Sequence, residues 1–181
     1  MFIQTEETPN PDALKFITGT DITGTPIHFA NKDEAKGAIL VLNLFKIEGV
    51  KAVFFGADFI TITKNEKEKW EALKPHIVSL IMDHLTSGMH ALEGYKPYSE
   101  AENKDYSDIE QQIIEIIETR VRPSVAMDGG DIVYKSFKDG IVYLELKGSC
   151  SGCPSSEITL KNGIESMLQY YVPEVIGVEQ I

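Results

Sequence analysis

Basic residues, cysteines and long apolar runs are all scarce in this chain of 181 residues. Its only arginines are Arg120 and Arg122, and acidic residues outnumber basic ones by 13 to 10 in residues 1–98 and by 15 to 7 in residues 99–181. Nucleic acids and anionic membranes bind largely through lysine and arginine, so neither is an expected partner. The longest apolar run, residues 38–45, is far shorter than the roughly 20 residues of a membrane-spanning helix. We therefore expect no membrane span.

The first residues and the cysteine count both bear on the cellular compartment. Residues 1–10 hold two acids and no base, whereas secretory signals begin with basic residues and transit peptides are rich in arginine. The two cysteines stand three positions apart, so a framework of structural disulfides is excluded. These features predict a cytoplasmic protein, with the bacterial cytosol favoured and a processed mitochondrial form left open.

Two β-hairpins and two helices are predicted for a first domain, residues 1–93. Turn-forming residues 8–12 separate two apolar stretches, which predicts a hairpin with Ile3 and Phe16 facing a core. Residues 50–55 and 59–63 predict a second hairpin. Apolar residues at three- and four-residue spacing predict helices at 32–45, with Ala35, Ile39, Leu42 and Phe45 on the core face, and at 67–86, where Pro75 kinks the helix or delays its start.

A second domain, residues 107–181, follows a polar linker at residues 94–106 that lacks periodicity. Its pattern is α-β-β-α-β, so the predicted class for the whole chain is α+β. Ser107 is expected to cap a helix that stops before Pro123. The remaining elements are strands at 131–137 and 141–147 around Asp139-Gly140, a helix from Pro154 to Tyr171, and a strand at 175–181.

The chemistry of the chain centres on Cys150-Ser-Gly-Cys153-Pro154. A Cys-x-x-Cys loop brings two sulfurs close enough to ligate one metal centre, and Gly152 removes a side chain that would crowd the turn. The helix expected after Cys153 favours thiolate over thiol at its first turn. The motif alone leaves metal binding, dithiol redox chemistry and an incidental role open.

The surroundings of the motif favour a metal centre. The proline follows the second cysteine instead of standing between the two, and the βαβ pattern of thioredoxin-like sites is absent. Zinc and iron-sulfur centres usually take four protein ligands, and this chain supplies two cysteines. Two chains, each giving Cys150 and Cys153, would complete a four-thiolate shell around one cluster. A dithiol-disulfide oxidoreductase and a dimer held by structural zinc remain the alternatives.

Other residues with reactive side chains predict no further site. The four histidines all lie in the first domain, where ordinary polar-face or core roles are expected. Asp128 and Asp131 flank Gly129-Gly130 and are expected to be solvated turn residues. No histidine lies in the domain of the serines beside the cysteines, so we expect no serine hydrolase. With cluster carriage as the leading hypothesis, we expect no enzyme. The histidines are His28, His76, His84 and His90.

Two segments also resemble a known family. Residues 127–131, Met-Asp-Gly-Gly-Asp, and residues 148–156, Gly-Ser-Cys-Ser-Gly-Cys-Pro-Ser-Ser, resemble the NifU C-terminal domain of Nfu-type iron-sulfur cluster carriers. That match spans residues 107–181. Residues 2–16 look like the start of the Nfu N-terminal domain, and the similarity continues to about residue 92, so the resemblance is nearly full-length.

The resemblance implies a carrier that binds a [4Fe-4S] cluster at a dimer interface. Its ligands map onto Cys150 and Cys153, and the partners it implies are upstream cluster donors and apo iron-sulfur client proteins. Larger NifU proteins add a cysteine-bearing assembly domain and a ferredoxin-like domain, and neither is found here, which argues against assembly of new clusters. The first domain, without a ligand cluster, is expected to recognise partners.

Overall fold

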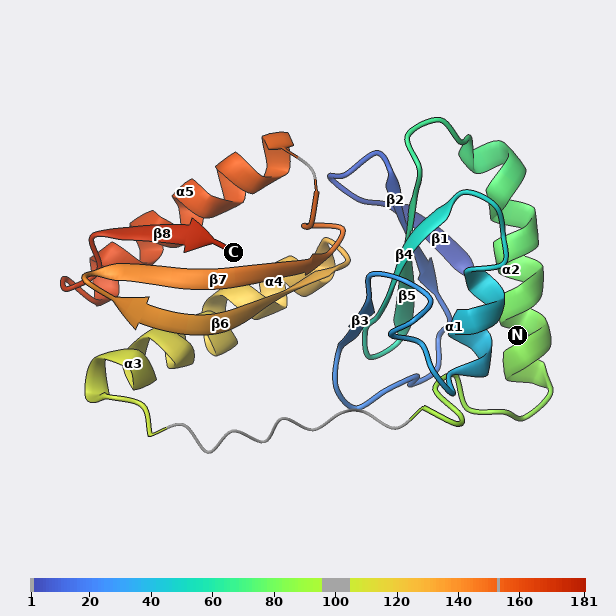
Figure 1. The fold of residues 1–181 in the computed structure, drawn as a ribbon, viewed down its shortest axis with the longest axis horizontal. Coiled ribbons are helices and arrows are strands. Elements are labelled where there is room, and N and C mark those ends of the chain that lie inside the picture. Colours follow the sequence, from blue (N-terminus) through green and yellow to red (C-terminus); the bar gives the residue numbers. More distant parts are fainter. Residues whose placement is uncertain (1, 96–104, 153) are drawn as a thin grey trace. The chain divides into compact units, whose positions relative to one another are not determined.

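The computed structural model describes residues 2–95, 105–152 and 154–181. The chain separates into two compact units, Met1–Tyr98 and Ser99–Ile181 (Figure 1). Each unit has its own hydrophobic core. The predicted linker, 94–106, falls largely on residues 96–104, which lie outside the described residues, so it stays a prediction. No helix in the described ranges is both long and apolar enough to cross a bilayer.

The first unit is a five-stranded antiparallel sheet with two helices on one face (Figure 1). The strand order is β1-β2-β5-β4-β3, which places β5 at the centre. Both predicted hairpins are confirmed, and β3 is a strand that the sequence did not predict. The elements are β1 (Gln4–Glu7), β2 (Ala13–Ile17), β3 (Ile27–Phe29), α1 (Ile39–Leu44), β4 (Val50–Phe55), β5 (Phe59–Lys64) and α2 (Trp70–Thr86).

The first hairpin turns where its polar residues bond to their own backbone. The Asn10 side chain accepts a hydrogen bond from the Asp12 amide at 3.0 Å, an arrangement typical of Asx turns. The expectation that Ile3 and Phe16 face the core is confirmed, since both are buried. The turn-forming residues and the alternation of apolar residues therefore both predicted this hairpin correctly.

The helix expected at 32–45 is much shorter than predicted. Residues 32–37 form turns, and Gly37 has a left-handed backbone with φ of 87°, so the α-helix begins only at Ile39. The predicted core face is wrong in part, because Ile39 is 44% exposed while Leu40, Val41 and Leu44 are buried. The late start rotates the buried face away from the one that the longer pattern indicated.

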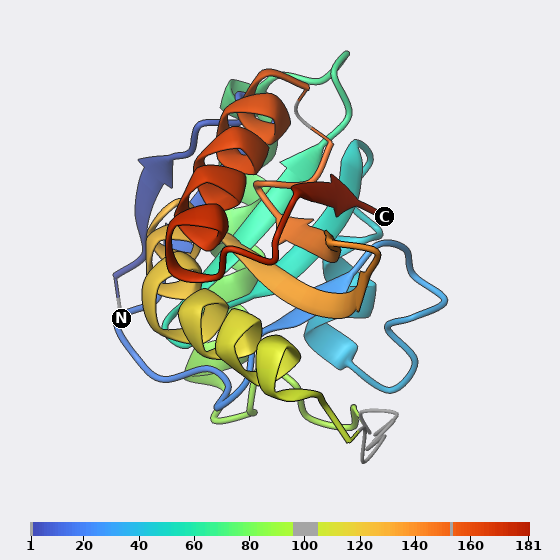
Figure 2. The same ribbon diagram turned by 90° about the vertical axis from the view of Figure 1, so that its left-hand side faces the viewer.

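The second unit packs its helices against one face of a three-stranded sheet, as both views show (Figures 1 and 2). The predicted α-β-β-α-β order and the α+β class are confirmed. The strand order is β6-β7-β8, antiparallel within the β6–β7 pair and parallel within the β7–β8 pair. The elements are α3 (Asp108–Ile116), the π-helical turn η1 (Ile117–Val121), α4 (Arg122–Met127), β6 (Gly130–Lys138), β7 (Ile141–Gly148), α5 (Pro154–Tyr171) and β8 (Gly177–Gln180).

The first helical segment of this unit starts as predicted and ends later than predicted. Ser107 accepts from the Glu110 amide while the Glu110 carboxylate accepts from the Ser107 amide, which is a complete capping box. The stop before Pro123 is wrong. The chain widens into η1 and continues as α4, with Pro123 in the first turn of α4, where its missing N–H costs little.

Candidate metal centre

The Cys150 loop joins the end of β7 to the start of α5. β6 and β7 form a hairpin around Asp139-Gly140, where both residues have positive φ, as the Asp-Gly pair predicted. Gly130 pairs with Gly148 at the opposite end of this hairpin. The ladder thereby brings the start of β6 beside the loop that carries the cysteines.

Cys150 lies close to the backbone of Gly130. A β-carbon built on Gly130 would stand 2.7 Å from Cys150 Sγ and 2.7 Å from the Lys147 carbonyl oxygen. Only glycine fits there, since β-carbons do not approach other atoms so closely. The sequence predicts a turn at Gly129-Gly130, and the structure adds a close approach of the Gly130 backbone to Cys150.

The Cys150 thiol is shielded from solvent. Its residue is 7% exposed and packs with the hydrophobic core of the second unit. The Ser149 hydroxyl lies 3.9 Å from Cys150 Sγ and donates a short hydrogen bond to the Asp128 carbonyl oxygen. The Ser149 amide also donates to Gly129 at 3.3 Å. These bonds fasten the loop to the turn between α4 and β6.

Asp131 is held beside this turn by an ion pair that the sequence did not predict. It is buried, and its carboxylate accepts from Arg122 Nε at 2.8 Å and from Nη2 at 3.0 Å. Arg122 also contacts Glu118 one helical turn earlier, at 2.7 Å. The bonds from Asp131 raise the pKa of Arg122 above its ordinary value, and those from Glu118 add to the effect. The expectation of a solvated turn residue is therefore wrong for Asp131.

The far side of the loop leads into α5. The Gly152 amide donates to Glu157 Oε1 at 2.8 Å, which turns the chain toward the helix. Gly152 has φ of 80°, and a β-carbon there would meet nothing within 4 Å. The glycine thus serves the backbone conformation, not the relief of crowding that the sequence indicated. Cys153 lies outside the described residues, so its role as a ligand stays a prediction.

The four histidines lie in the first unit, as expected from the sequence. His84 is buried, with Nε2 2.9 Å from the His90 carbonyl oxygen, which is an ordinary core role. Among residues 2–95, 105–152 and 154–181, no three His, Cys, Asp or Glu side chains gather as a metal site would require. The described part of one chain therefore offers Cys150 without a completed ligand set around it.

The expectation that no βαβ pattern surrounds the cysteines is wrong. The sequence showed no βαβ pattern around the cysteines, yet β7 and β8 are parallel neighbours joined through α5. The cysteine loop thus precedes the helix of a βαβ unit, and β8 was too short a segment for its direction to be read from the sequence. The position of Pro154 after the motif remains the difference from thioredoxin-like sites.

Comparison with known families covers both units. Residues 3–88 match the model described as scaffold protein Nfu/NifU N terminal, and residues 113–179 match the NifU-like domain. The human protein named NFU1 iron-sulfur cluster scaffold homolog, mitochondrial, is 52% identical over 183 residues, which cover 100% of this chain and 72% of the human protein. The protein of the same name from Drosophila erecta is 48% identical, and the chain spans 65% of its length.

A solved structure is similar over part of the chain. The solution structure of a NifU-like protein from Saccharomyces cerevisiae is 31% identical and covers 51% of this chain and 84% of its own, with a TM-score of 0.47. That overlap is too limited to bear on the site. The two matched domains and the full coverage of this chain by the human relative show that the chain belongs to the Nfu family.

Proposed function

We propose that this chain carries a [4Fe-4S] cluster between two copies of itself, bound by Cys150 and Cys153 of each, and delivers it to apo iron-sulfur proteins. The cluster is its cargo. The observation that carries the proposal is the seat of Cys150, where the absence of a side chain at Gly130 leaves room for a thiolate beside the β6–β7 ladder. The relatives are named iron-sulfur cluster scaffold homologs, and this chain matches the human one over its whole length while carrying both Nfu-family domains.

The donor set fits a shared cluster. Thiolate is the usual ligand of iron-sulfur clusters, and four are needed where each chain supplies two. Because α5 begins directly after Cys153, the positive end of its dipole would favour a thiolate at Cys153. Because Cys150 is shielded, loading requires the loop to open at least partly, and a cluster held by two ligands per chain should also leave more readily than one enclosed in a single chain.

The role is that of a carrier and not of an enzyme. Upstream donors would supply the cluster and apo clients would receive it, with no bond in a substrate made or broken by the chain itself. The named relatives are mitochondrial, so a mitochondrial form is proposed beside the cytoplasmic one that the sequence predicted.

A dithiol oxidoreductase is the second candidate, favoured by the βαβ unit around the cysteine loop. It predicts rapid reduction of a model disulfide that Cys150→Ser abolishes. A dimer held by structural zinc predicts a colourless protein with zinc bound to four thiolates. Both outcomes differ from that of a cluster carrier.

The deciding experiment measures iron, sulfide and zinc per chain, together with oligomeric mass, after purification without oxygen. About two iron and two sulfide per chain in a dimer, with the spectroscopic signature of a four-iron centre, support the proposal. The matched control is the Cys150→Ser, Cys153→Ser double variant, which should stay folded and bind neither iron nor sulfide. Transfer is checked by activation of an apo [4Fe-4S] enzyme. Zinc, or a metal-free monomer after reconstitution with iron and sulfide, overturns the proposal.

A further inference from the structure

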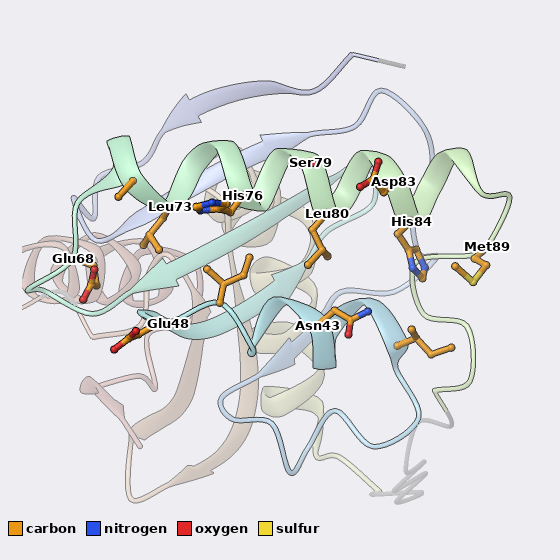
Figure 3. A pocket seen from close by; sticks show the side chains of 13 residues that line it. Asn43, Glu48, Glu68, Leu73, His76, Ser79, Leu80, Asp83, His84 and Met89 are labelled. Carbon is orange, nitrogen blue, oxygen red and sulfur yellow. The ribbon is translucent and has the colours of Figure 1, made fainter.

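A groove lies between α1 and α2 in the first unit, and the cluster site does not use it. It has a volume of about 820 Å³ and is lined by residues of both helices and of the segments that flank them (Figure 3). Its floor is apolar, with buried Leu73 and half-buried Leu80 and Ile47. Figure 3 shows the Leu73 and Leu80 side chains pointing from α2 into the space toward α1.

The groove is negatively charged at its rim. Glu48, Glu68 and Asp83 line it, and none of its described lining residues is a lysine or arginine. Glu48 and Glu68 lie together at one end, while Asp83 stands farther along α2 (Figure 3). Lys46 also reaches the groove, where its Nζ donates to Oδ1 of the lining residue Asn43 at 2.8 Å.

The shape suits a helix. Lining residues on α2 run from Ala72 to His84, which is about 18 Å at the rise of an α-helix, or some three turns of a parallel occupant. An amphipathic helix that lays apolar side chains at i, i+3, i+4 and i+7 into an apolar groove is a common mode of recognition. The acidic rim would then meet the flanks of that helix, where lysine or arginine is the complement.

We propose that this groove, defined by α1, α2 and the acids Glu48, Glu68 and Asp83, docks a basic amphipathic helix of a partner protein. A second copy of the chain fits less well, because the chain carries a net charge of −11 and would bring acidic surface to an acidic rim. The groove residues all belong to the first unit, whereas the cysteines belong to the second.

The test uses the full chain and two synthetic helical peptides of equal length. Both peptides carry leucine at i, i+3, i+4 and i+7, and the remaining positions are lysine-rich in one and glutamate-rich in the other. Binding is followed by fluorescence anisotropy at low and high salt, and the contact surface by amide chemical shifts. The expected result is binding of the lysine peptide alone, weakened by salt, with shifts confined to α1, α2 and their flanks.

Variants distinguish binding in the groove from non-specific attraction of the lysine peptide to the acidic surface. Changing Glu48 and Glu68 to Gln together with Asp83→Asn should weaken binding of the lysine peptide by about tenfold. The matched control neutralises three exposed acids that do not line the groove, Asp58, Glu66 and Glu71, and should leave binding unchanged. Leu80→Asp should abolish it, with circular dichroism confirming that the variant is folded.

Other outcomes overturn the proposal. Equal binding of both peptides, shifts outside the groove, or no difference between the two triple variants would each contradict it. Self-association of the chain that Leu80→Asp removes would assign the groove to a second copy instead. Iron and sulfide content is measured in parallel and should be unchanged in the groove variants, so failure of peptide binding is distinct from failure of the cluster proposal.

Discussion

At the scale of single residues, the position of Cys150 depends on the absence of a side chain at Gly130. The glycine belongs to β6 and the thiol to the loop after β7, and the two meet because Gly130 pairs with Gly148 across the ladder. One neighbour, the Lys147 carbonyl oxygen, is backbone and cannot rotate away. The position of Cys150 is therefore sensitive to a single methyl group.

Gly130→Ala should consequently disturb both stability and cluster binding. We expect the free energy of unfolding to fall by about 1–3 kcal/mol, as for other overpacked sites, and the cluster to be lost faster to a chelator. Urea denaturation and iron retention measure the two effects. Gly163→Ala in α5 is the control, because its β-carbon would meet nothing within 4 Å and should stabilise the helix by roughly 0.5–1 kcal/mol. Equal behaviour of the two variants would contradict the role of Gly130.

The two arms of Arg122 allow a second comparison. Asp131 is buried whereas Glu118 is largely solvated, with side-chain exposures of 7% and 49%. Asp131→Asn removes the shielded charge partner and should lower the free energy of unfolding by about 1–3 kcal/mol. Glu118→Gln removes the solvated partner and should cost below about 1 kcal/mol. Thermal denaturation of both variants checks the order, and a larger loss for Glu118→Gln would refute it.

At the scale of elements, the start of α3 is fixed by Glu110. Its carboxylate accepts from the Ser107 amide at 2.9 Å and from the Tyr134 hydroxyl at 2.6 Å, so it joins α3 to β6. The Tyr134 bond, followed by that from Ser107, lowers the pKa of Glu110 below its ordinary value of 4.5. Burial and the same bond to Glu110 raise the pKa of Tyr134.

The lowered pKa of Glu110 sets the sign of a pH dependence. Around pH 4.5 the unfolded state binds more protons at this group, so its stabilisation is full above that pH and is lost as the pH falls through the folded value. Glu110→Gln should therefore be less stable than the unchanged protein at pH 7, with the difference shrinking below about pH 4.5. Urea midpoints from pH 3.5 to 7 measure it. Glu115→Gln, exposed in the same helix, should show little such trend.

The sequence predicted turns and helix caps well where the interactions that form them lie within a few residues. The Asp139-Gly140 turn and the Ser107 cap act within a few residues, and both are found as expected. The predicted start of the first helix was wrong because it depends on the left-handed backbone of Gly37. The predicted helix end before Pro123 was wrong because the chain continues through a π-helical turn. Periodicity of apolar residues reveals neither feature. The burial of Asp131 depends on Arg122 from another element, and no sequence spacing indicated that pair.

At the scale of the whole molecule, the two units have separate cores, so their tasks should be separable. Residues 105–181 expressed alone should fold and bind iron and sulfide at the stoichiometry of the full chain, while residues 1–95 should fold and bind neither. Dispersed amide spectra establish folding, and iron and sulfide assays establish loading. Loss of loading in the folded fragment 105–181 would show that the first unit contributes to the cluster site.

The parallel pairing of β7 with β8 has a consequence for the order of folding. The β6–β7 hairpin closes over a two-residue turn, whereas β8 reaches β7 only after the chain has passed through the cysteine loop and all of α5. Contacts distant in sequence form later than local ones. On refolding, the hairpin should therefore form first, and the pairing of residues 141–144 with residues 177–180 should lag behind it, so β7 is an open sheet edge along those residues during that interval.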